Sequence, residues 1–206
     1  MKSTSTLFSI LLATLLIAGC AKNEKEEQAQ QDTEEAKSPV DALQALADKA
    51  SKMGDREAVD PVDFRKLKEL LPDKIAGLSR TEASGEKSGA MGFTVSSAEA
   101  LYQNDNGESV KIEIIDTGGL AGVSTMTLAA WSIAEIDKET TEGYEKTTTL
   151  EGYKAFENYN NKSKSGELNV LVEERYIVDI EGNKLTMEQL KEVLKSLNLS
   201  KLAGLK

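Results

Sequence analysis

The sequence predicts an α+β fold in which a mostly antiparallel sheet of about five strands carries an N-terminal, a middle and a C-terminal helix. Three observations lead to this fold class. Turn-forming residues separate short β-rich runs, strands do not alternate with helices, and an amphipathic helical pattern stands near each end of the folded part. Hairpins without strand–helix–strand units are typical of antiparallel sheets with helices packed on them. We expect one such domain over residues 39–206.

Two helix starts near the beginning of this domain share the same local chemistry. Ser38-Pro39-Val40-Asp41 combines a capping hydroxyl, a proline at the first helical position and an acid in the first turn. The apolar side chains behind it recur at helical spacing as far as Gly54. They are Val40, Leu43, Leu46, Ala47, Ala50 and Met53. Asp60-Pro61-Val62-Asp63 repeats this start, and Pro72 ends the second predicted helix.

Hairpins account for the central part of the domain. A run near residues 91–103 leads into Asn104-Asp105-Asn106-Gly107, and apolar residues alternate over 110–114, which predicts a hairpin at the Asn-Gly turn. A second hairpin is expected from about Thr147 to Tyr159. The run from Glu167 to Ile180 is long for one strand, so we predict two strands that turn around residues 173–175.

The last predicted element is an amphipathic helix that begins at Thr186-Met187-Glu188-Gln189, a sequence with the pattern of a capping box. Its apolar stripe consists of Leu190, Val193, Leu194 and Leu197. The order of elements is similar to that of the PsbP-like α/β/α sandwiches, a family that recurs among bacterial lipoproteins. This resemblance concerns topology, and it implies no function.

The segment from Val123 to Ile136 is apolar on nearly all sides and carries the tryptophan of this chain, Trp131. A helix that is apolar all round is usually buried, which gives Trp131 a place in the core. The alternative is that one side of this segment, with Trp131, meets a partner protein or a lipid. Exposure of Trp131 distinguishes the two interpretations.

The N-terminus has the three parts of a secretory signal: a charge at Lys2, an apolar core from Leu7 to Ile17, and small residues before a cysteine. The sequence Ile17-Ala18-Gly19-Cys20 resembles the lipobox of bacterial lipoproteins. In that family the cysteine receives diacylglycerol and becomes the first residue after cleavage. The resemblance implies a signal peptide over residues 1–19, cleavage between Gly19 and Cys20, and a lipid, commonly palmitate, on Cys20.

Residues 21–38 follow the cysteine without any large apolar or aromatic side chain, so we predict that residues 20–38 consist of the lipidated Cys20 and a disordered acidic tether. The lipoprotein resemblance implies attachment to the cell envelope, and Ala21 after the cysteine favours the outer membrane facing the periplasm where the organism is Gram-negative. The apolar run is shorter than the roughly 20 residues that a spanning helix needs.

Composition excludes several classes of function. The chain has 25 basic and 35 acidic residues; without residues 1–19, which contain Lys2, it keeps 24 basic and 35 acidic residues, a net charge of −11. Such an acidic chain is a poor nucleic-acid binder. The absence of histidine, and of any cysteine except Cys20, excludes Ser-His-Asp and Cys-His catalysis and the usual zinc sites.

Ile114-Ile115-Asp116-Thr117-Gly118-Gly119 resembles the Asp-Thr-Gly signature of aspartic proteases. Two such carboxylates must share a proton, and the sequence contains no second Asp-Thr/Ser-Gly. We therefore interpret the motif as a strand that ends in a glycine turn. The sequence predicts a non-catalytic binding or accessory module, with no cofactor and no metal ligand. The alternatives are a carboxylate-dependent hydrolase that uses Asp116, and a carrier of an apolar ligand.

Overall fold

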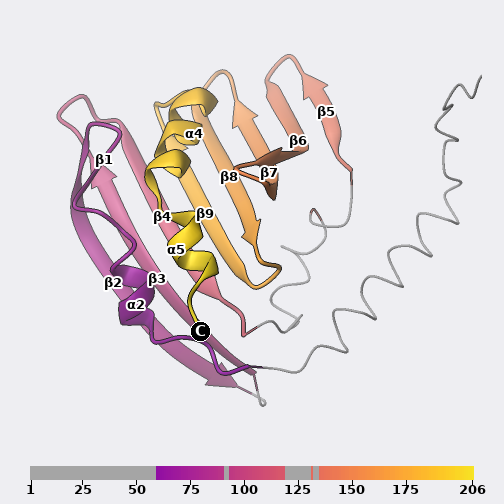
Figure 1. Ribbon diagram of the computed structural model, residues 1–206. Coiled ribbons are helices and arrows are strands. Elements are labelled where there is room, and N and C mark those ends of the chain that lie inside the picture. Colours follow the sequence, from indigo (N-terminus) through magenta and orange to yellow (C-terminus); the bar gives the residue numbers. More distant parts are fainter. Residues whose placement is uncertain (1–58, 91–92, 119–130, 132–134) are drawn as a thin grey trace, which may run out of the picture. The chain divides into compact units, whose positions relative to one another are not determined.

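The computed structural model describes residues 59–90, 93–118, 131 and 135–206, and these residues form one nine-stranded antiparallel sheet with short helices (Figure 1). The predicted signal peptide, lipobox and tether lie outside the described residues, as does the helix predicted from Ser38 to Gly54. The elements are α2 (Phe64–Lys68), β1 (Lys74–Ile75), β2 (Leu78–Ala90), β3 (Phe93–Gln103), β4 (Ser109–Asp116), β5 (Asp137–Thr140), β6 (Gly143–Leu150), β7 (Tyr153–Asn160), β8 (Ser165–Val172), β9 (Tyr176–Asn183), α4 (Met187–Ser196) and α5 (Leu199–Ala203).

The predicted fold class, about five strands with three packed helices, is wrong. The sheet has nine strands, and the described residues contain three short helices, of five, ten and five residues. The fold is therefore dominated by the sheet. None of the described helices is long and apolar enough to cross a membrane.

The strand order β1-β2-β3-β4-β9-β8-β7-β6-β5 shows that the sheet consists of two meanders. The first runs from β1 to β4. The second starts at the opposite edge with β5 and returns strand by strand to β9, which pairs with β4. This pairing places Ile112 opposite Ile180 and Ile114 opposite Val178, residues far apart in the sequence. The β4–β9 ladder is thus the seam that joins the two halves of the sheet.

Two of the missed strands lack the residues that usually indicate a strand. The longest, β2, contains no valine, isoleucine or aromatic residue and includes Gly85 and Gly89, so its sequence is typical of a loop. It nevertheless pairs with β3 along almost its full length. The edge strand β5 has four exposed residues, Asp137 to Thr140, three of them charged. Short charged strands are typical of sheet edges, because charge prevents pairing with another chain.

The hairpins were predicted correctly. The turn between β3 and β4 is closed by the Asn104 side chain, whose Oδ1 accepts hydrogen bonds from the N–H groups of Asn106 and Glu108. Gly107 adopts a φ of 75° there, which suits glycine. The predicted hairpin at 147–159 lies within β6 and β7, and the run at 167–180 divides into β8 and β9 as expected.

The capping box at the start of α4 is also confirmed. Thr186 accepts a hydrogen bond from the Gln189 N–H, and the Gln189 side chain accepts one from the Thr186 N–H. The helix expected from Asp60 to Pro72 is shorter than predicted, because it begins after the N-cap Asp63. The preceding residues are not helical, and the Val62 N–H donates to a side chain at the end of β4.

The helices α2, α4 and α5 lie over one face of the sheet (Figure 1). Strand β4 buries every second residue on this face, and its partners in β3, β9 and β8 continue the same apolar rows. Glycines let the helices approach closely: a Cβ on Gly182 would lie 2.4 Å from Leu190 of α4, and one on Gly85 would lie 2.7 Å from Phe64 of α2. The main core is the layer between these helices and the sheet.

The opposite face of β3, β4, β9 and β8 carries side chains that alternate with the core rows, and we call it the polar face. Its row at the middle of the sheet consists of Glu99, Glu113, Asp179, Asn169 and Phe156, which are register partners from strand to strand. Trp131 lies against this face, since its ring stacks on that of Phe156 at a centroid distance of 6.3 Å.

Gly143 provides a test of how tightly the second meander is packed. A Cβ there would lie 1.9 Å from the Tyr159 carbonyl oxygen, a backbone atom that cannot move aside without disturbing the β6–β7 pairing. We expect Gly143→Ala to lower the free energy of unfolding by about 1–3 kcal/mol, measured by urea denaturation. Gly204→Ala is the control, because its Cβ would meet no atom closer than 3.5 Å and its φ is −82°. Equal midpoints for the two variants would contradict this packing.

Candidate functional site

Asp116, the residue of the Asp-Thr-Gly motif, lies at the end of β4 and is fully buried. Its Oδ1 accepts hydrogen bonds from the Arg175 Nε at 2.8 Å and from the Gly118 N–H at 2.9 Å. Its Oδ2 accepts from an Arg175 terminal nitrogen at 2.7 Å and from the Val62 N–H at 2.9 Å. A carboxylate offers about four acceptor positions, so this one is fully occupied.

This geometry gives the Asp-Thr-Gly motif a structural task. A general base must be able to reach a proton of its substrate, and an aspartic protease needs a second carboxylate beside the first. The partner of Asp116 is instead a guanidinium held in a bidentate pair, which fixes both oxygens. Thr117 extends the same contact, since its hydroxyl donates to the Arg175 carbonyl oxygen at 2.9 Å. The motif therefore ties the end of β4 to the β8–β9 turn.

Trp131, the residue singled out for a partner surface, is 6% exposed. Its indole is buried against Phe156, as expected for a core position, and so offers little surface of its own. Within the described part of the chain its Nε1 has no hydrogen-bond acceptor. The remainder of the predicted middle helix, apart from residues 135 and 136, lies outside the described residues.

Glu157 is a second buried carboxylate, and no motif or spacing in the sequence indicates it. It lies on the helix-covered face with 1% exposure, 2.9 Å from the Lys191 Nζ of α4 and 3.5 Å from the Lys146 Nζ of β6. The Tyr144 hydroxyl donates to its Oε2 at 3.1 Å. Burial, followed by the charge of Glu157, raises the pKa of Tyr144. With two cations and a hydroxyl as partners, Glu157 joins α4 to the second meander.

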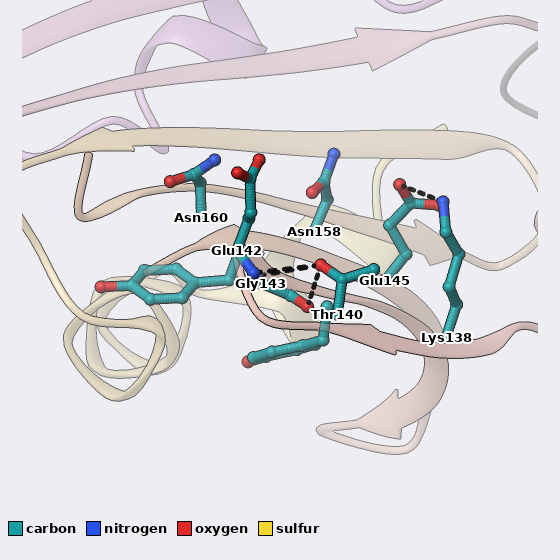
Figure 2. Close-up of a pocket in the computed structure, with 9 residues that line it drawn as sticks. Lys138, Thr140, Glu142, Gly143, Glu145, Asn158 and Asn160 are labelled. Carbon is teal, nitrogen blue, oxygen red and sulfur yellow. Dashed lines mark hydrogen bonds and ion pairs between the residues drawn. The ribbon is translucent and has the colours of Figure 1, made fainter. Parts of the chain in front are cut away.

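A shallow pocket of about 190 Å³ lies where β5, β6 and β7 meet. Figure 2 shows Asn158, Asn160, Glu142 and Glu145 projecting in a common direction beside it. Its polar groups already bind one another: Lys138 pairs with Glu145 at 3.3 Å, and Glu142 pairs with Lys162 at 2.5 Å. The Thr140 hydroxyl closes the β5–β6 turn through the N–H groups of Glu142 and Gly143. These contacts account for the pocket as the edge of the sheet.

The polar face brings together five carboxylates from β3, β4, β9 and β8, which we call the carboxylate cluster. They are Glu99, Glu113, Asp179, Glu181 and Glu167. Three pairs of them stand directly opposite each other on neighbouring strands: Glu99 with Glu113, Glu113 with Asp179, and Glu181 with Glu167. The cation paired with the cluster in the described residues is Lys111, whose Nζ lies 2.5 Å from Glu181.

The electrostatics of the carboxylate cluster favour proton uptake. Burial and the nearby charges of Glu167 and Glu181 raise the pKa of Asp179 from its ordinary value of 3.8 to about 7. Burial and the charge of Glu99 also raise the pKa of Glu113. The charge of Lys111 lowers the pKa of both groups, but this one positive charge does not balance burial and the neighbouring carboxylates. Near neutral pH the cluster therefore exchanges a proton at Asp179.

The clearest unsatisfied groups of the polar face are two oxygens that neighbour each other in register. Asn169 is 1% exposed, and its Nδ2 donates to Glu167 Oε1 at 2.7 Å. Among the described residues its Oδ1 has no donor, and neither has the buried Oδ1 of its cross-strand partner Asp179. Buried oxygens normally accept a hydrogen bond, so this pair marks a place where a proton, a water molecule or a ligand completes the site.

The sequence contains a signal for these residues that composition and motifs do not use. Asn169 and Asp179 each interrupt an apolar run, Leu168-Asn169-Val170 and Val178-Asp179-Ile180, in predicted strands. Period-2 alternation places them opposite the core face. Asn169 and Asp179 lie opposite each other because of the β8–β9 register, which cannot be deduced from the sequence alone.

The chemistry available to the carboxylate cluster is the binding of cations. Over residues 59–90, 93–118, 131 and 135–206, no group of three or more acidic, histidine or cysteine side chains has the arrangement of a metal site.

Searches with the sequence and the fold give no match among protein-family models, curated proteins or solved structures. The resemblance to the PsbP-like sandwiches therefore stays a prediction.

Removal of the Asp116 charge tests its structural role. We expect Asp116→Asn to lower the free energy of unfolding by about 3–5 kcal/mol, because it leaves a largely buried guanidinium without its partner. Chemical denaturation measures this loss. The control Glu142→Gln breaks an exposed ion pair and should change stability by less than about 1 kcal/mol. Similar small effects of both substitutions would show that Asp116 does not hold the fold together.

The raised pKa of Asp179 predicts how stability depends on pH. The folded state keeps the proton up to about pH 7, whereas the unfolded chain releases it near 3.8, so this group favours folding at low pH and loses that contribution as pH rises through about 7. Asp179→Asn removes the dependence. Relative to the parent protein, its free energy of unfolding should rise by about 2–4 kcal/mol between pH 4 and pH 8. A constant difference in denaturation experiments at the two pH values would contradict the assignment.

Proposed function

We propose that this protein is a lipoprotein of the bacterial cell envelope, anchored through lipid on Cys20, whose domain binds a ligand and does not catalyse a reaction. The site of anchoring is the outer membrane facing the periplasm where the organism has one. The proposal combines the N-terminal motif with the chemistry of the sheet, and each part has its own support.

The anchor is supported by the sequence Ile17-Ala18-Gly19-Cys20 after an apolar core of signal-peptide length. Each buried methylene contributes about 0.8 kcal/mol to membrane binding, so two or more acyl chains hold a protein stably where one does not. The polar, acidic composition of residues 21–38 is suited to a tether.

The observation that carries the binding role is the pair of unsatisfied buried oxygens on Asn169 and Asp179, within the carboxylate cluster. A binding site contains such groups, because a ligand that enters it can supply the missing donor. The contacts of Asp116 support the second part of the proposal, that the domain does not catalyse a reaction. The one residue with a resemblance to catalytic chemistry uses its acceptor positions for Arg175 and two backbone N–H groups.

The anchor is tested by expression of the full chain in a bacterium, membrane fractionation, and mass spectrometry of the mature N-terminal peptide. We expect the parent protein in the membrane fraction, with an N-terminal peptide that begins at Cys20 and carries diacylglycerol. Cys20→Ser should abolish the lipid and the membrane association. Ala21→Ser is the matched control, since it leaves the lipobox intact. An unmodified Cys20, or a Cys20→Ser variant that stays in the membrane, would refute the anchor.

A further inference from the structure

The carboxylate cluster has an arrangement that destabilises the sheet. Like charges placed directly opposite each other on neighbouring strands destabilise a sheet. Here Glu113 stands between two acids, Glu99 and Asp179, in one row across β3, β4 and β9. The nearby Lys111 pairs with Glu181 in the next row and does not separate these three groups. A cation that bridges the row would convert repulsion into attraction.

Asn169 gives an independent indication of what the cation must provide. Its amide continues the row of Glu99, Glu113 and Asp179 onto β8, and its Oδ1 is buried without a donor among the described residues. An oxygen of this kind is satisfied by an N–H or O–H group. A ligand with both a positive charge and N–H donors therefore fits the oxygens of Asn169 and Asp179 together.

Aromatic rings border the row at its β7 end. Phe156 is the register partner of Asn169, and the Trp131 ring stacks on it. Of the two rings only Phe156 is partly exposed, and it can contact the methylene groups of an alkylammonium ligand, which a bare ion lacks.

We propose that the carboxylate cluster, together with Asn169, binds a linear aliphatic polyamine. Neighbouring strands are about 4.8 Å apart, so the row repeats at nearly the spacing of two ammonium groups joined by three methylenes. A slender chain laid across the strands brings successive ammonium groups over Glu113, Asp179 and Asn169. Asn169 is 1% exposed, so its oxygen can be approached only by a single slender end group, such as a primary ammonium, and not by the surface of a basic protein.

Binding is coupled to the proton on Asp179. Its pKa of about 7 reflects burial and the neighbouring acids Glu167, Glu181 and Glu113, opposed by Lys111. An ammonium group beside this carboxyl favours the ionised form. Polyamine binding at pH 7 therefore releases a proton from the protein, which distinguishes a specific contact with Asp179 from diffuse attraction to an acidic surface.

Isothermal titration calorimetry of the purified full chain in detergent with spermidine tests the proposal. We expect saturable binding of one molecule, with a heat that varies with the ionisation enthalpy of the buffer at pH 7. Asp179→Asn and Glu113→Gln should each raise the dissociation constant about tenfold or more. Asp179→Asn should also abolish the proton release. Glu86→Gln is the matched control, since it removes one charge from the same face of β2, three strands away from β9.

Several results would overturn the proposal. They are the absence of saturable binding at millimolar spermidine, an equal loss in Glu86→Gln, and tighter binding of calcium or tetralysine with the same dependence on Asp179. This proposal identifies the ligand of the binding domain proposed above, and it therefore rests on that proposed function. The calorimetric result does not depend on lipid at Cys20, so failure of the ligand and failure of the anchor are observed separately.

Discussion

The bidentate pair between Asp116 and Arg175 is the contact on which the arrangement of the sheet depends. The two meanders meet at the β4–β9 ladder, and Asp116 is the last β4 residue of that ladder, paired with Tyr176. Arg175 directly precedes Tyr176, so the ion pair fixes the entry of β9 against the end of β4. The Val62 N–H adds the segment that leads into α2. One fully buried carboxylate thus joins three stretches of chain, and its charge is balanced where it lies.

The two faces of the sheet treat buried acids in opposite ways. On the helix-covered face, Asp116 has an arginine and Glu157 has two lysines, so each carboxylate is paired within hydrogen-bond or ion-pair distance. On the polar face, the charges that act most strongly on Asp179 are the carboxylates of Glu167 and Glu181, and its Oδ1 has no donor in the described residues. Basic side chains therefore neutralise the buried acids of the helix-covered face, whereas Asp179 has no such ion pair in the described residues. That contrast separates the structural groups from the candidate ligand groups.

The sequence predicted the local parts of this fold well and the non-local parts poorly. The turn at Asn104–Gly107 and the capping box at Thr186 depend on residues a few positions apart, and both were predicted correctly. Strand β2 was missed because its polar residues become a strand only by pairing with β3. Asp116 could be recognised as a strand end, but its partner Arg175 lies 59 residues away. Asn169 and Asp179 stand out as polar residues in apolar runs, while their meeting depends on register.

The cost of the carboxylate cluster to the free protein is limited by the proton that Asp179 holds. A raised pKa means that the folded chain takes up a proton in preference to keeping another negative charge beside Glu167, Glu181 and Glu113. The proton removes part of the repulsion in the row, and a hydroxyl on the carboxyl can satisfy a buried acceptor. A bound cation would exchange places with this proton, because both supply one positive charge at the same oxygens. A protein that must stay folded both with and without its ligand is well served by a carboxyl that titrates near neutrality.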